Sequence, residues 1–89
     1  MGKNDVPFQI AVLDRGWVFA GNCEFDDEFL VITNAKCIRY WGTTRGLGEL
    51  AENGPNPKTR IDSYGTVRVN SRALIALIDC DKEEKWNAS

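Results

Sequence analysis

The residues best equipped for binding chemistry lie in one loop near the middle of the chain. Glycines expose backbone N–H groups, threonines offer hydroxyls, and arginine supplies a permanent positive charge, a combination that suits a phosphate or another anion. The loop therefore predicts a site for a small anionic, nucleotide-like ligand, with Arg45 as the charge that pairs with it. The sequence of this loop is Trp41-Gly42-Thr43-Thr44-Arg45-Gly46.

A plainer interpretation of the same loop stays open. Gly42 and Gly46 could supply the positive φ angles of a strand-to-helix corner, and Thr43 or Thr44 could cap the helix that follows. The glycine spacing matches neither a dinucleotide-binding fingerprint nor a P-loop. The sequence does not decide between a ligand site and a structural corner.

Further candidate ligand contacts flank the loop. Tyr40 and Trp41 are adjacent on a predicted strand, so one should point into the core and the other outward, where it could stack a base. Lys58 and Arg60 lie in a Pro- and Asn-containing segment that is long enough to close over an anion. Ordinary packing of the aromatic rings and ordinary solvation of the two cations are the alternatives.

The composition excludes several classes of catalytic and metal site. The chain has no histidine, which rules out Ser-His-Asp and Cys-His catalysis and His-containing zinc sites. Cys23, Cys37 and Cys80 form no CxxC pair and lie in strand-like runs, so we expect reduced thiols that pack in the core. The acids from Asp26 to Glu28 fit a solvated turn better than metal or acid–base chemistry. We therefore expect no enzymatic activity, no metal and no cofactor.

The charge of the chain argues against general binding to nucleic acid. The formal net charge is −2 at pH 7, whereas such binding needs many Lys and Arg contacts to phosphates. The chain shows no secretion signal and no apolar run long enough to span a bilayer. We expect a cytoplasmic protein without membrane contact.

The length of 89 residues predicts a single domain over residues 1–89, with an ordered core over about 8–80 and frayed ends. Residues 17–25 alternate with a period of two, as in a half-buried strand. Residues 47–53 predict a short helix that stops at Asn53-Gly54-Pro55, and residues 54–64 predict a loop. Strands are predicted over 8–13, 17–25, 28–33, 36–41, 66–69 and 73–79.

Several short strands with one helical insert predict a mainly β fold. We expect a small antiparallel β-barrel of about six strands, of the SH3-like or Sm-like type, with an open α+β sandwich as the alternative. A barrel this small leaves apolar surface and strand edges uncovered, so we expect a homo-oligomer. The helical pattern from Lys82 to Trp86 suggests an exposed Trp86 that docks on a neighbouring subunit.

Roughly half of the chain resembles a family of small uncharacterised proteins of tailed phages and prophages. The similar segments are Ile38 to Pro55, Thr59 to Asp62 and Val69 to Ile78, and the motif is Trp-Gly-Thr-Thr-x-Gly-Leu-Gly-Glu-Leu-Ala. The resemblance implies a viral accessory role without an assigned activity. More weakly, the pair of strands from Gly65 to Ile75 is similar to the closing strands of Sm-like barrels.

The loop and the resemblance together give the leading functional hypothesis. It is a non-enzymatic phage-type protein that binds a small anionic ligand and sequesters a cyclic-nucleotide immune signal, as an anti-defence sponge does. One alternative is a protein-interaction module that blocks a host factor or serves as a small virion component. The other is an Sm-like ring that binds RNA, which the acidic balance disfavours.

Overall fold

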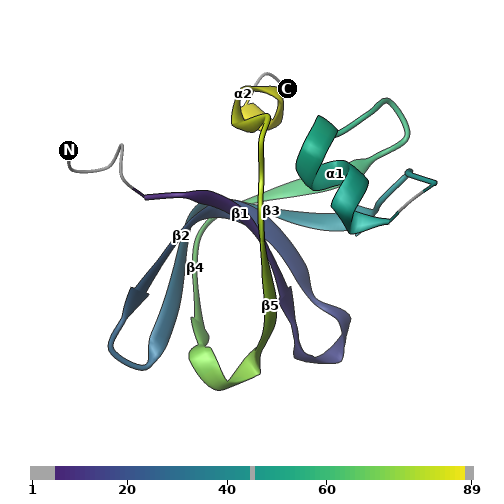
Figure 1. Cartoon of the computed structure of the whole chain (residues 1–89). Coiled ribbons are helices and arrows are strands. Elements are labelled where there is room, and N and C mark those ends of the chain that lie inside the picture. The colour runs from purple at the N-terminus through teal and green to yellow at the C-terminus, as the bar shows by residue number, and fades with distance from the viewer. Residues whose placement is uncertain (1–5, 45, 88–89) are drawn as a thin grey trace.

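The computed structural model describes residues 6–44 and 46–87, which form one five-stranded antiparallel sheet and two short helices (Figure 1). The strand order is β4-β3-β2-β1-β5. The prediction of a mainly β antiparallel fold is confirmed. In the part described, the edge strands β4 and β5 do not pair with each other, so the sheet is open rather than a closed barrel. The elements are β1 (Phe8–Leu13), η2 (Asp14–Gly16), β2 (Val18–Asp26), β3 (Phe29–Tyr40), α1 (Leu47–Asn53), β4 (Arg60–Asn70), η3 (Ser71–Ala73), β5 (Leu74–Asp79) and α2 (Glu83–Asn87).

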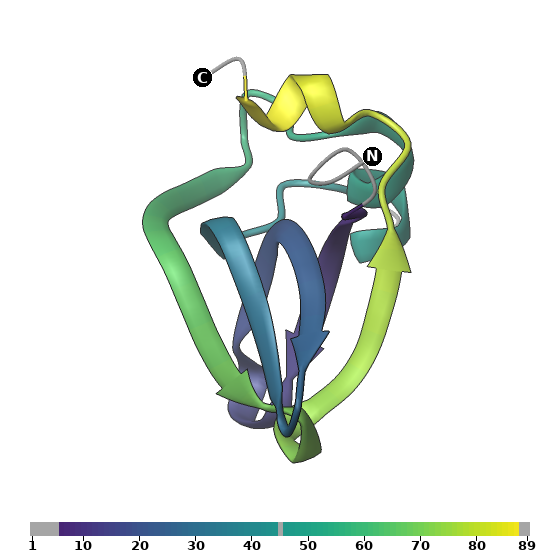
Figure 2. The same ribbon diagram turned by 90° about the vertical axis from the view of Figure 1, so that its left-hand side faces the viewer.

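The sheet is strongly bent. Figure 2 shows β4 and β5 on opposite sides of the molecule, with both helices at one end and the turns after β1, β2 and β4 at the other. Each face of the sheet carries its own hydrophobic cluster.

The inner cluster lies within the curl of the sheet. Val67 and Val69 of β4 and Leu74 and Leu77 of β5 pack against it, so both edge strands cover a core built on β1, β2 and β3. The presence of cysteines among its buried members confirms the packing role predicted for Cys23 and Cys37. These members are Ala11, Leu13, Phe19, Cys23, Leu30, Ile32, Ala35 and Cys37.

The helix-side cluster lies on the other face, under α1 and α2. Trp86 of α2 is fully buried there and its ring lies 5.7 Å from that of Phe8. The expectation of an exposed Trp86 is therefore wrong, and the ordered chain continues past residue 80 into α2. The buried members of this cluster are Phe8, Ile10, Val18, Ala20, Ile38, Leu50, Ala51 and Trp86, with Cys80 packed against them.

Two of the predicted strands form a single strand in the structure. Residues 28–33 and 36–41 were predicted as separate strands joined by a turn at Asn34-Ala35, but β3 runs without a break from Phe29 to Tyr40. Asn34 has φ 53 and sits in an irregularity of the pairing, which bends the strand instead of reversing it. The sheet therefore has five strands rather than six.

The segment predicted as a loop from Gly54 to Tyr64 is also partly strand. β4 begins at Arg60, and Ile61 pairs with Ile38 and packs partly buried on the helix-side cluster. An edge strand needs few apolar residues, so this polar segment carries little strand signal.

By contrast, α1 has the predicted bounds, and Gly54 ends it with φ 80 and an N–H that donates to the Leu50 carbonyl at 2.8 Å.

No helix in residues 6–44 and 46–87 has the length and apolarity required to cross a membrane.

Candidate functional site

The predicted ligand loop folds back on the start of β4 to form a single corner. We call this region the corner: Trp41 to Thr44, Gly46, and Asn56 to Arg60. Gly42 has φ 70, and a Cβ atom there would lie 2.7 Å from the Lys58 carbonyl carbon. Only glycine fits this close approach in that conformation.

Side chains of the second segment hold the two parts of the corner together. The Asn56 side-chain amide donates to the Gly42 carbonyl at 2.8 Å, and the Thr59 hydroxyl donates to the Trp41 carbonyl at 2.8 Å. The Asn56 N–H donates in turn to the Thr59 hydroxyl at 3.0 Å. Because the first two bonds join residues 14 and 18 positions apart in sequence, they fix the loop against the segment that leads into β4.

The threonines of the loop are engaged within the chain. The Thr43 hydroxyl donates to the Gly46 carbonyl at 2.8 Å, and the Thr44 hydroxyl donates to a Glu49 carboxylate oxygen at 3.3 Å. The predicted threonine cap is not formed, since Gly46 with φ 80 is the N-cap of α1 and no side chain caps it in the part described. The hydroxyl protons are therefore used locally, whereas the positive φ angles predicted for Gly42 and Gly46 are confirmed.

Aromatic and cationic side chains gather at the solvent side of the corner. Tyr40 and Trp41 are both exposed, 58% and 41%, so the prediction that one of them is in the core is wrong. With Arg39, Gly42 and Thr43 they line a hollow of about 260 Å³.

The predicted cations of the corner do come near the loop. Arg60 lies opposite Tyr40 in the β3–β4 register, and the backbone of Lys58 touches Gly42. Both cations are exposed, and neither has an ion-pair partner among the described residues. Arg39 is different, because it pairs with Asp62 at 2.9 Å. Arg45, the predicted partner of the anion, lies outside the described residues.

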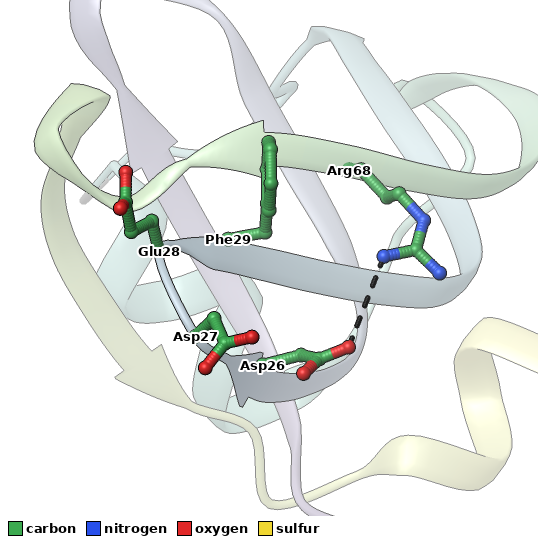
Figure 3. A pocket seen from close by; sticks show the side chains of 5 residues that line it. All are labelled: Asp26, Asp27, Glu28, Phe29 and Arg68. Atoms are coloured by element: carbon green, nitrogen blue, oxygen red, sulfur yellow. Dashed lines mark ion pairs between the residues drawn. The ribbon is translucent and has the colours of Figure 1, made fainter.

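The acidic turn between β2 and β3 borders a hollow of about 640 Å³ (Figure 3). Asp26 pairs with Phe29 in the register, so Asp27, at φ 55, and Glu28 form the turn. Arg68 approaches Asp26 at 3.9 Å, and all of these side chains are exposed. Across the described residues, no group of three or more His, Cys, Asp or Glu side chains is placed to hold a metal ion. The exposed turn predicted for these acids is confirmed.

The three thiols are free and unactivated. Burial raises the pKa of Cys23 to about 11 and that of Cys80 to about 12. Burial also raises the pKa of Cys37, although the nearby Arg39 opposes the rise. Thiols with raised pKa values stay protonated near neutral pH and are poor nucleophiles.

The sequence analysis did not identify a second group of aromatic side chains. Trp17 stacks on Phe19 with ring centroids 5.9 Å apart, and Tyr64 meets Phe19 edge-on at 5.3 Å. Trp17 and Tyr64 remain 49% and 46% exposed. Tyr64 lay in a predicted loop, so no local signal placed it beside β2; the pairing of β4 with β3 does so.

Comparison of the chain with protein-family models, curated proteins and solved structures finds no match.

Proposed function

We propose that this protein binds a small anionic ligand at the corner without transforming it, and that it serves a phage or prophage by sequestering a cyclic-nucleotide immune signal. One observation carries the proposal. An exposed indole, Trp41, shares the corner with two exposed cations, Lys58 and Arg60, that no described carboxylate neutralises. Stacking on an aromatic face and pairing with cations are the two interactions that a base and its phosphate require.

The hydrogen bonds inside the corner support this proposal in a specific way. A rigid corner loses little conformational entropy when a ligand binds, which favours affinity. Because the hydroxyls of Thr43 and Thr44 donate within the chain, charge and stacking carry the recognition rather than the threonine cradle. Sequestration requires only tight binding and no reactive side chain.

A thermal-shift screen with cyclic di- and trinucleotides, nucleoside phosphates and ADP-ribose derivatives tests the proposal. A ligand at a hundredfold excess over Kd stabilises the fold by about 2.7 kcal/mol. Lys58→Ala, Arg60→Ala and Arg45→Ala should each weaken binding by about ten- to a hundredfold, since each removes a charge-assisted contact. Arg72→Ala, which removes an exposed arginine of η3, is the control. A screen in which none of these compounds raises the melting temperature would refute the proposal.

The open edges of the sheet favour a second candidate function, that of a protein-interaction module. Ile75 on the edge strand β5 is 67% exposed, which is unusual for an isoleucine in a strand. An interaction module should show no stabilisation by nucleotides and should retain a defined host protein in a pull-down that Ile75→Lys abolishes.

A further inference from the structure

Two neighbouring hollows share Trp17 and Tyr64 and together form what we call the Trp17 groove. One hollow, of about 290 Å³, is lined mainly by apolar side chains, among them Leu13, Val69 and Ala73, and Asp14 is its one charged lining residue. The other, of about 410 Å³, carries two arginines, Arg15 and Arg39. The groove thus has an apolar half and a cationic half that meet at the aromatic pair.

The apolar half is formed before any ligand arrives. The rings of Trp17 and Phe19 are nearly parallel, with 2° between their planes, and Tyr64 is held against Phe19. Phe19 itself is buried, whereas about half of the Trp17 and Tyr64 surfaces face solvent. Exposed aromatic side chains that are fixed by a buried neighbour and line a hollow are typical of a small-ligand site.

The cationic half contains one free charge. Arg39 is neutralised by Asp62 at 2.9 Å, but the Arg15 guanidinium has no ion-pair partner in the part of the chain described. Arg15 lies in the tight turn between β1 and β2, where the Leu13 N–H donates to the Trp17 carbonyl at 2.8 Å. The turn therefore presents an unpaired cation in the hollow that adjoins the apolar one.

The backbone at Arg15 is a second, independent observation. Its φ is 65, a conformation that side chains other than those of Gly, Asn and Asp rarely adopt. The other described non-glycine residues with positive φ are Asp27 and Asn34, which belong to the tolerant types. The turn itself gives no reason for an arginine at position 15, whereas recognition of an anion at the groove does.

We propose that the Trp17 groove binds a small amphipathic acid. The apolar body of the ligand, a fused ring or a structure of similar bulk, lies in the hollow against Trp17 and Tyr64, and its carboxylate pairs with Arg15. The volumes of the two hollows suit a small molecule rather than a macromolecule. This site is additional to the corner and uses neither Lys58 nor Arg60.

Calorimetric titration of the full chain with three probes separates the contributions of the ligand's apolar body and of its charge to the affinity. The probes are 1-naphthaleneacetate, the uncharged 1-naphthalenemethanol, and acetate. We expect 1-naphthaleneacetate to bind about tenfold more tightly than the alcohol, as expected for one charge-assisted contact, and acetate not to bind measurably. The signal of Trp17 should shift on binding in an NMR titration. Equal affinity for the acid and the alcohol would overturn the proposal.

Matched variants test which half of the Trp17 groove binds which part of the ligand. Arg15→Asn removes the charge and keeps a residue type that tolerates positive φ, so the fold should survive while 1-naphthaleneacetate loses about tenfold in affinity. Arg68→Gln also removes one positive charge, but Arg68 lies by Asp26 at the acidic turn (Figure 3), so affinity should be unchanged. Ala73→Leu should fill the apolar hollow and weaken the acid and the alcohol alike. Parent-like affinity in Arg15→Asn, or an equal loss in Arg68→Gln, contradicts the assignment even if Ala73→Leu fails to fold.

Discussion

The indole of Trp86 is the principal anchor of α2. It is completely buried against Phe8 in the helix-side cluster, so a helix of only five residues is fixed to the sheet by one large side chain. Its ring nitrogen Nε1 is buried without a hydrogen-bond partner in the part described. The ring therefore stabilises the fold by burying apolar surface, while its N–H group opposes folding.

Two substitutions separate these effects. Trp86→Ala should lower the free energy of unfolding by about 3–5 kcal/mol, because it leaves a large cavity. Trp86→Phe should cost far less, since a ring remains and the unsatisfied N–H is removed. Urea denaturation measures both losses of stability, and Trp17→Phe, at a half-exposed tryptophan, is the control. Equal losses in the two Trp86 variants would contradict burial of the ring as the main stabilising effect.

The buried thiols make the free energy of unfolding fall at alkaline pH. The folded-state pKa of Cys23 is about 11, against 9.0 for an unperturbed thiol, because burial disfavours the thiolate. Below pH 9 both folded and unfolded chains keep the proton, so the stabilisation is fully present. Between about pH 9 and 11 the unfolded chain loses its proton first, and stability falls with rising pH.

Cys23→Ala should therefore reduce the alkaline loss of stability. One group contributes at most about 1.4 kcal/mol per pH unit. The urea midpoints of the parent and Cys23→Ala, measured at pH 7.5 and pH 10, give the difference. If the parent loses no more stability than the variant between these two values, the thiol is not buried as the structure has it.

At the scale of elements, the bend of β3 depends on Gly21 in the neighbouring strand. A Cβ atom at position 21 would lie 2.6 Å from the Ile32 side chain and 2.8 Å from the Thr33 carbonyl oxygen. The pairing of β2 with β3 is irregular between Ala20 and Asn22, opposite this contact. A side chain at Gly21 would force the two strands apart where they bend together.

We expect Gly21→Ala to destabilise the fold by about 1–3 kcal/mol, the usual cost of overpacking. Gly48→Ala is the matched control, since Gly48 lies in α1 and a Cβ there meets nothing within 4 Å. It should stabilise the helix by about 0.5–1 kcal/mol. Thermal denaturation compares them, and a Gly21→Ala variant as stable as the parent would show that β2 and β3 are free to separate.

The elements that could be predicted are those with local signals. The bounds of α1 follow from a Leu-Ala pattern and the Asn-Gly-Pro stop, and β5 was predicted to within one residue because its apolar run is continuous. The start of β4 and the continuity of β3 follow instead from pairing between distant strands. The two candidate sites differ in the same way, because one depends on a local sequence and the other on contacts between distant strands. The corner has a sequence motif, whereas the Trp17 groove exists only after β4 brings Tyr64 to Phe19.

At the scale of the whole molecule, two strand edges stay open. β4 pairs only with β3, and β5 only with β1, in the part of the chain described. Unpaired edges expose backbone N–H and carbonyl groups that can pair with another chain. Ile75 adds a large exposed apolar side chain to the β5 edge.

The homo-oligomer stays a prediction, and the open edges say where to test it. If copies of the chain join through β5, light scattering coupled to gel filtration should give a multiple of the 10.0 kDa chain mass. Ile75→Lys should shift the protein toward the monomer, because a charge on an edge strand opposes pairing with another edge. Thr33→Lys introduces the same charge at an exposed position of β3, which β2 and β1 separate from β5 in the sheet, and should leave the mass unchanged. A 10.0 kDa parent at micromolar concentration would refute the oligomer, whereas an Ile75→Lys variant with the parent's mass would move the interface away from β5.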